Sequence, residues 1–177
     1  KFTFSLDGWD VSKVTDMTSL FEGAESFNGI ITNWVTSSVT SMSRMFFDAK
    51  KFNRNLNAVG SKWNTASVSN MKEMFKGALE FNGEVENWNT RAVTTMESMF
   101  ENCKSFNQDV STWIDLRKVT SMSRMFKGCT TFNKPLNSAS WKLGTASVTT
   151  MKEMFSGATS MNGLISGWKL GSVTNMA

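Results

Sequence analysis

Large apolar residues recur along the chain in a fixed order, and this order returns every 25 to 29 residues. A valine follows each tryptophan by five to seven residues, and a methionine follows each valine by three. The tryptophans, by which we number repeats 1 to 7, are Trp9, Trp34, Trp63, Trp88, Trp113, Trp141 and Trp168. Self-similarity at this period indicates an array of stacked structural repeats that share one continuous core.

An apolar stripe in each repeat predicts one short helix. In repeat 1 the stripe runs from Val14 through Met17 to Ala24 with the spacing of one helix face. A residue able to cap a helix precedes the first methionine of every repeat. These residues are Asp16, Ser41, Asn70, Thr95, Ser121, Thr150 and Asn175. Near the end of the stripe stands a residue, mostly Gly or Asn, suited to a left-handed helix end. These are Gly23, Asp48, Gly77, Asn102, Gly128 and Gly157.

The rest of each repeat, such as 27–34, has no helical spacing and is expected to be extended. One strand and one helical turn within 25 residues fit the length range of leucine-rich repeats. The expected fold class is therefore an α/β repeat, a right-handed leucine-rich-repeat-like solenoid with a parallel sheet and short helical turns. We expect 1–177 to be a single solenoid of about seven repeats of 25 to 29 residues, cut within a repeat at both ends. Insertions near 58–62 and 138–140 should form surface loops.

Composition and charge argue against most chemical functions. The chain has no histidine, and its 15 carboxylates show no recurring pair at the spacing of an acid/base dyad. We therefore expect no enzyme, catalytic residue, cofactor or metal site. The net charge of +4 is mild and its basic residues are scattered, so no nucleic-acid partner is expected. No apolar run approaches the length of a membrane span, so no membrane insertion is expected in this fragment.

Several residue columns have both a structural and a functional interpretation. The tryptophan and methionine columns could stack bases or bind soft metals, but their fixed places favour core packing. Asparagines follow the second phenylalanine of the repeat, or Met161 in the last of them, and could contact a ligand, but they are expected to form a ladder that satisfies backbone groups. These are Asn28, Asn53, Asn82, Asn107, Asn133 and Asn162. Cys103 and Cys129 occupy equivalent places in neighbouring repeats, where either a disulfide or two buried free thiols would fit.

The segments 39–53, 68–82 and 93–107 read VTSMSRMFFDAKKFN, VSNMKEMFKGALEFN and VTTMESMFENCKSFN. This pattern resembles the repeat of BspA-like bacterial surface proteins, particularly the Met-Phe and Trp-rich version of mycoplasma surface lipoproteins. It is also similar to the treponemal class of leucine-rich repeat. The resemblance spans essentially the whole chain. It implies display at the cell surface or outside the cell, and adhesion to a host or neighbouring-cell surface protein or matrix, as a monomer or part of a longer array. It implies no catalytic residues.

Two functions from different classes remain. The first is adhesion or protein binding through exposed residues that vary between repeats, with Arg44 and Arg124 as candidate partner contacts. The alternative is binding to ice or another crystal surface through a column of threonines, broken only by Ser69. The column comprises Thr15, Thr40, Thr94, Thr120, Thr149 and Thr174. Its position beside the capping column suggests that local hydrogen bonding explains it equally well.

Overall fold

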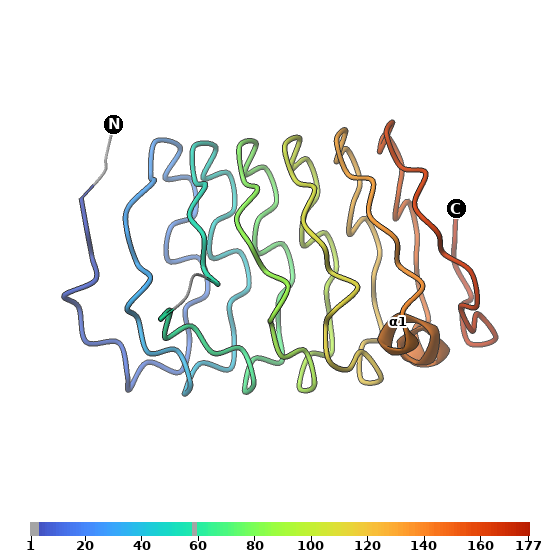
Figure 1. The fold of residues 1–177 in the computed structure, drawn as a ribbon, viewed down its shortest axis with the longest axis horizontal. Coiled ribbons are helices and arrows are strands. Elements are labelled where there is room, and N and C mark those ends of the chain that lie inside the picture. The colour runs from blue at the N-terminus through green and yellow to red at the C-terminus, as the bar shows by residue number, and fades with distance from the viewer. Residues whose placement is uncertain (1–3, 58–59) are drawn as a thin grey trace.

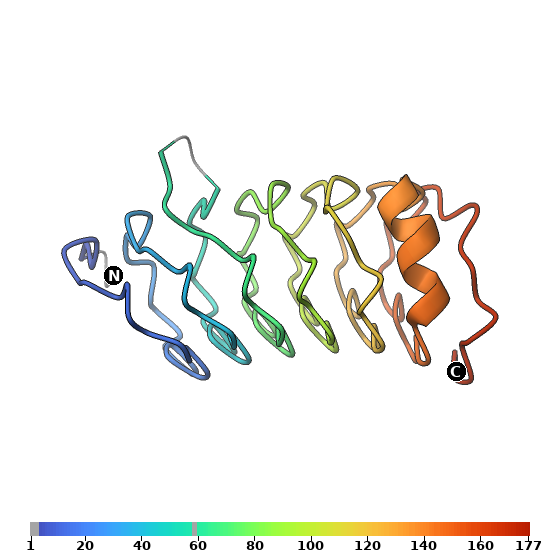
Figure 2. The ribbon, with the colours of Figure 1, turned by 90° about the horizontal axis from the view of Figure 1, so that it is seen from below.

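A computed structural model of the chain describes residues 4–57 and 60–177. Successive repeats lie side by side in a row, and the two chain ends lie at opposite ends of that row (Figure 1). A view turned by 90° shows the same order of coils along the long axis (Figure 2). The Trp–Val turns line the lower edge in Figure 1. By this term we mean the residues between each tryptophan and the repeated valine five to seven residues after it.

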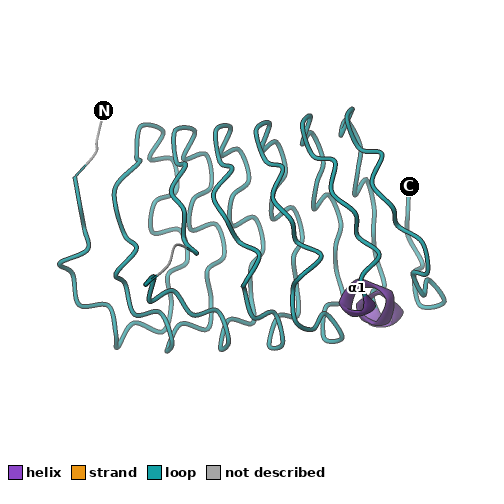
Figure 3. Ribbon diagram, in the orientation of Figure 1, coloured by secondary structure: helices purple, strands orange, loops and turns teal. Residues whose placement is uncertain are grey.

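Regular secondary structure is almost absent from the described residues (Figure 3). They contain the α-helix α1, Ala139–Gly144, and the 3-10 helix η1, Thr145–Ser147. Neighbouring repeats are joined by isolated parallel bridges, such as Asp16 with Ser41 and Ser41 with Asn70. No run of bridges within 4–57 and 60–177 is long enough to make a strand. The predicted parallel-sheet solenoid with helical turns is therefore wrong.

Two successive tight turns replace the predicted helix. In repeat 2, the Met45 N–H donates to the Met42 carbonyl at 3.2 Å, and the Ala49 N–H donates to the Phe46 carbonyl at 3.1 Å. The third residue of the first turn, Arg44, has φ of 56°, the left-handed value that a type II β-turn places there. Left-handed residues stop a right-handed helix from propagating. Yet the backbone hydrogen bonds between residues three apart place the apolar side chains on one side of the chain. The sequence spacing of these side chains is therefore the same as on one face of a helix.

Positive φ angles recur at two places in the turns of the described repeats. First-turn residues with positive φ are Ser19, Arg44, Glu73, Ser98, Arg124 and Glu153. Second-turn residues with positive φ are Gly23, Asp48, Gly77, Asn102, Gly128 and Gly157. The second group confirms the left-handed positions expected from the sequence, although they end turns and not helices.

The backbone N–H groups of these turns explain why no sheet forms. In repeat 1, alternate N–H groups donate to carbonyls of repeat 2 at 2.8 to 3.0 Å. The pairs are Met17 to Ser41, Ser19 to Ser43, Phe21 to Met45, and Gly23 to Phe47. The N–H groups between them bond within repeat 1. Along this stretch no N–H group of repeat 2 donates back to a carbonyl of repeat 1. A parallel sheet needs donation in both directions. Both directions occur at the isolated bridges. Beside Asp16 the Thr40 N–H donates back to the Thr15 carbonyl at 2.8 Å, and beside Ser5 the Ile30 N–H donates back to the Phe4 carbonyl at 3.3 Å.

Stacked aromatic rings fill the core. The Phe46 and Phe75 centroids lie 5.3 Å apart, and Phe75 and Phe100 are 5.7 Å apart with nearly parallel planes. A second column places Phe81 and Phe106 6.0 Å apart. These rings and the first methionines of repeats 1 to 6 are buried. The prediction that the phenylalanine and methionine columns form the core is confirmed.

Tryptophans tie consecutive repeats together through their indole N–H groups. Trp34 donates to the Leu6 carbonyl at 2.8 Å, and Trp113 donates to the Val85 carbonyl at 2.9 Å. Trp88 is an exception among the described residues. Its expected acceptor, the Leu56 carbonyl, instead accepts from Ser61 Oγ, and the buried Trp88 indole N–H has no partner. Trp34, Trp88, Trp113 and Trp141 are buried as predicted, whereas Trp9 is 60% exposed.

Surface loops are predicted at both sequence insertions, and the structure describes one of the two in full. The insertion near 138–140 does not form the expected loop, because Ala139 and Ser140 open α1. Ser140 Oγ donates to the Ile114 carbonyl at 2.9 Å, and Trp141 of the same helix is buried. The helix therefore fastens repeat 6 to repeat 5. For the insertion near 58–62, residues 58 and 59 lie outside the described part of the chain.

Candidate functional site

Both arginines proposed as partner contacts form ion pairs between repeats. Arg44 Nη1 lies 2.8 Å from Glu73 Oε2 of repeat 3, and the same guanidinium pairs with Glu22 of repeat 1. Its charged end also lies 4.0 Å from the centre of the Phe47 ring. Arg124 Nε lies 3.2 Å from a carboxylate oxygen of Glu153. The structure thus gives both side chains a role in joining repeats, and their contact with a partner stays a prediction.

The ion pairs make the stability of the folded chain depend on pH. Arg44 lowers the pKa of Glu22 to about 2, and Arg124, followed by Lys127, lowers the pKa of Glu153 to about 2. The unfolded carboxylates titrate near pH ~4.3. Their stabilisation is therefore present above that pH and is lost as the pH falls toward 2. We expect the urea midpoint to fall across this range, and to fall less steeply in Glu153→Gln, which cannot titrate. Equal slopes for both proteins would contradict the Glu153 ion pairs.

The predicted asparagine ladder is confirmed. The Asn82 N–H donates to Asn53 Oδ1 at 2.9 Å, and Asn82 Oδ1 accepts from the Asn107 N–H at 2.9 Å. The same bond links Asn28 to Asn53, Asn107 to Asn133, and Asn133 to Asn162. The side chains in this column are therefore used to hold the backbone of neighbouring repeats in register.

The threonine column is also bonded within the chain. Thr40 Oγ1 donates to the Thr15 carbonyl at 3.1 Å, and Thr94 Oγ1 donates to the Ser69 carbonyl at 3.0 Å. The same arrangement is found at Ser69, Thr120, Thr149 and Thr174. Each hydroxyl thus donates its hydrogen to the preceding repeat and keeps only acceptor sites for solvent.

Cys103 and Cys129 are both free and buried, and no disulfide joins them in this structure. Cys103 Sγ lies 2.8 Å from the Phe75 carbonyl oxygen, and Cys129 Sγ lies 2.9 Å from that of Phe100. Burial raises the pKa of Cys129 to about 12 and raises that of Cys103 well above its ordinary value. Both thiols therefore stay protonated at neutral pH and donate to the preceding repeat.

We expect both thiols of the native protein to be unreactive. A thiol reagent such as dithionitrobenzoate should react only after unfolding, because the thiolate is the reactive form and both groups are buried. The melting temperature should be the same with and without dithiothreitol. A marked fall in dithiothreitol would instead show that a disulfide forms.

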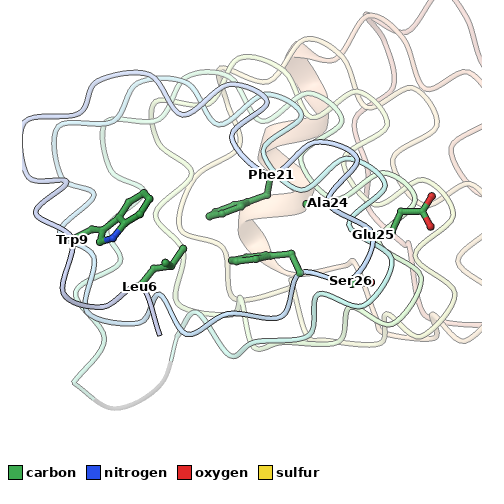
Figure 4. Close-up of a pocket in the computed structure, with 7 residues that line it drawn as sticks. Leu6, Trp9, Phe21, Ala24, Glu25 and Ser26 are labelled. Atoms are coloured by element: carbon green, nitrogen blue, oxygen red, sulfur yellow. The ribbon is translucent and has the colours of Figure 1, made fainter. Parts of the chain in front are cut away.

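An apolar pocket of about 590 Å³ lies at the N-terminal end of the row. Leu6, Trp9, Phe21 and Ala24 line it, with Phe27 beside them (Figure 4). These positions belong to the same columns that pack between repeats elsewhere. Phe21, for example, stacks on Phe46 of repeat 2 at 5.5 Å. The pocket is therefore the stacking surface of repeat 1, and its polar lining residues are Glu25 and Ser26.

The described residues 4–57 and 60–177 include no cluster of three or more acidic, histidine or cysteine side chains suited to a metal ion. None of the helices described there is long and apolar enough to cross a membrane.

Positive charge is concentrated on the Trp–Val turns, a feature that was not expected from the sequence. The seven turns carry six basic and two acidic residues, whereas the other 13 basic and 13 acidic residues of the chain balance. The excess comes from repeats 4 to 7. We call their turns, residues 89–92, 114–118, 142–147 and 169–172, the basic edge. Counting charge turn by turn would have revealed it, whereas the count over the whole chain concealed it.

Neighbouring turns of the basic edge are in contact. Thr90 Oγ1 donates to the Asp115 carbonyl at 2.9 Å, and the Lys169 N–H donates to Thr145 Oγ1 at 2.8 Å. An open depression of about 610 Å³ lies on this edge. Its lining residues are Ala66, Arg91, Ala92, Asp115, Arg117 and Lys118.

Comparison with curated proteins finds no match, and neither does comparison with solved structures. One family model matches residues 1–113, 57–146 and 114–177, which together span the chain. Its description is "Mycoplasma protein of unknown function, DUF285". The chain, with its sequence repeats and stacked coils, therefore belongs to DUF285, a Mycoplasma repeat family of unknown function.

Proposed function

We propose that the chain is a non-catalytic binding domain, displayed at the cell surface, that adheres to a protein of a host cell, a neighbouring cell or their matrix. The observation that carries this proposal is that repeated side chains and variable side chains have different places in the structure. Repeated residues pack inward or bond to neighbouring repeats, as Phe75, Asn82 and Cys103 do. Exposed residues differ from repeat to repeat, and the position before the second phenylalanine, for example, holds Lys51 in repeat 2 and Thr131 in repeat 5. A constant frame with variable exposed positions suits selective recognition of a partner.

Resemblance to BspA-like surface proteins supports the same function. The repeat carries the Met-Phe and Trp-rich pattern of that group, and membership of a Mycoplasma repeat family is compatible with it. The threonine column offers weaker support for binding to ice or another crystal, because its hydroxyl hydrogens are already donated to carbonyls. We expect no more thermal hysteresis than an unrelated protein of equal mass produces.

Binding to a defined panel tests the proposal. The chain should be immobilised and exposed to purified matrix proteins and to intact host cells, and binding should be measured by interferometry and by cell attachment. We expect saturable binding at micromolar concentration to at least one member. The matched control is Phe75→Ala, which keeps every exposed charge but should disrupt the stack. Binding that is absent throughout, or equal for the control after it has unfolded, would refute the proposal.

A further inference from the structure

We propose that the basic edge binds an extended polypeptide segment that carries both acidic and apolar side chains. This inference rests on the proposed binding function and names the chemistry of its partner. The first argument is charge. Arg91, Lys118, Lys142 and Lys169 belong to no ion pair within 4–57 and 60–177, and Arg117 is paired with Asp115 of its own turn. Four positive charges are thus left uncompensated along one edge.

Most basic residues on another set of turns behave differently. On the turns that follow the first methionine of each repeat, most cations face a glutamate of the same or an adjacent repeat. The ion-paired cations are Arg44, Lys50, Lys51, Lys72, Lys76, Arg124, Lys127 and Lys152. Positive charge on these turns is therefore neutralised by ion pairs, most of which hold neighbouring repeats in register. The uncompensated charge of the basic edge has no such use and would attract an anionic partner.

Exposed apolar side chains on the same edge narrow the choice of partner. Among the described residues of repeats 2 to 6, Ile114 and Leu143 are the large apolar side chains on the Trp–Val turns that are about half exposed, at 48% and 49%. Leu170 of repeat 7 is 38% exposed on the next turn. A sulfated polysaccharide has no apolar branches to cover them. A peptide that alternates acidic and apolar residues fits both features.

The spacing of the edge suits an extended chain. The tryptophan rings that precede three of the four turns follow one another along the stack, with Trp113 and Trp141 6.4 Å apart and Trp141 and Trp168 5.8 Å apart. The turns therefore present their charges as a line along the stack. Side chains on one side of an extended peptide recur about every 6.8 Å. A peptide whose acidic and apolar side chains alternate on one side can therefore place one of the two kinds against each successive turn.

Fluorescence anisotropy with the full chain tests the assignment. The probe is a labelled twelve-residue peptide, Glu-Ser-Leu-Ser repeated three times, with two comparison peptides in which Lys replaces Glu or Ser replaces Leu. We expect the probe to bind and both comparison peptides to bind at least tenfold more weakly. The variant R91E/K118E should weaken binding about tenfold. The matched control K104E/K134E, which has the same net charge and alters residues outside ion pairs, should not.

A second pair of variants tests the apolar part. I114S/L143S should weaken probe binding, whereas L20S/L164S, which removes leucines that are 45% and 63% exposed on the end repeats, should not. Melting curves must show that each variant is folded. Heparin and phosphatidylserine vesicles serve as competing anions. The assignment is overturned if the native chain does not bind the probe, if R91E/K118E binds it normally, or if either anion binds more tightly with no dependence on Ile114 and Leu143.

The two proposals fail differently. Saturable binding to a member of the host panel that is unaffected by R91E/K118E would preserve the binding function and reject the basic edge as its site. Absence of any panel binding, together with peptide binding that depends on the edge, would reject adhesion and retain the edge as a peptide site.

Discussion

Replacing Phe75 with alanine should lower the free energy of unfolding by about 3 to 5 kcal/mol, the usual cost of removing a buried aromatic ring. The ring is fully buried in the middle of the stack. It lies 4.0 Å from Phe81 of its own repeat, and 5.3 and 5.7 Å from Phe46 and Phe100 of the two neighbouring repeats. Its loss leaves a cavity bordered by three repeats, and the neighbours cannot close it without breaking their own contacts. Urea unfolding followed by tryptophan fluorescence measures the change.

Phe47→Ala is the matched control for this substitution. Phe47 follows directly after Phe46 but is only half-buried, and its main contact is the Arg44 guanidinium over its ring. Its removal should cost no more than about 1 kcal/mol, the typical size of an exposed cation–π contact. Similar losses for the two variants would show that the phenylalanine column does not carry the core.

The sequence was sufficient to predict which side chains face inward and which hold the register. The phenylalanine and methionine columns are buried, and the asparagines after Phe52, Phe81 and Phe106 bond from repeat to repeat. These predictions succeeded because the same chemistry returns in every repeat. A position that is always apolar, or always an amide, reveals its environment without any knowledge of the backbone path.

The backbone path itself could not be predicted from spacing. Apolar residues at intervals of three and four are shared by a helix face and by consecutive turns closed between residues three apart. The decisive feature is the left-handed φ at Arg44, Glu73 and Ser98. Each of these residues has a Cβ and none is a usual left-handed residue, so the sequence gives no warning of the turn.

The ion pairs of the two candidate arginines could not be predicted for a related reason. Arg44 and Arg124 seemed free because they stand at variable positions, but their partners Glu22, Glu73 and Glu153 lie 22 to 29 residues away. Those pairs become visible only once the stacking register is known. The basic edge has the opposite property. Four of its five cations belong to no ion pair among the described residues, and it becomes visible when charge is counted by position within the repeat.

Replacing Gly77 with valine should cost about 2 to 4 kcal/mol, from backbone strain and steric overlap together. Gly77 has φ of 75°, which a β-branched residue strongly disfavours, and a Cβ there would lie 1.9 Å from Asp48 Oδ1 of the preceding repeat. Its N–H also donates to the Glu101 carbonyl at 2.8 Å, so the backbone cannot move aside freely. Gly171→Val is the control, since no atom lies within 4 Å of a Cβ at that position.

The two contributions at Gly77 can be separated with a second substitution. Asp48→Gly removes the side chain that a new Cβ would strike, but it leaves φ at position 77 unchanged. The double variant should therefore regain only the steric part of the loss, and chemical unfolding of the four proteins in one cycle gives that part directly. Full recovery would mean that left-handed geometry at the second turn is dispensable. No recovery would mean that backbone strain alone sets the cost, and that the turn tolerates only residues able to adopt a positive φ.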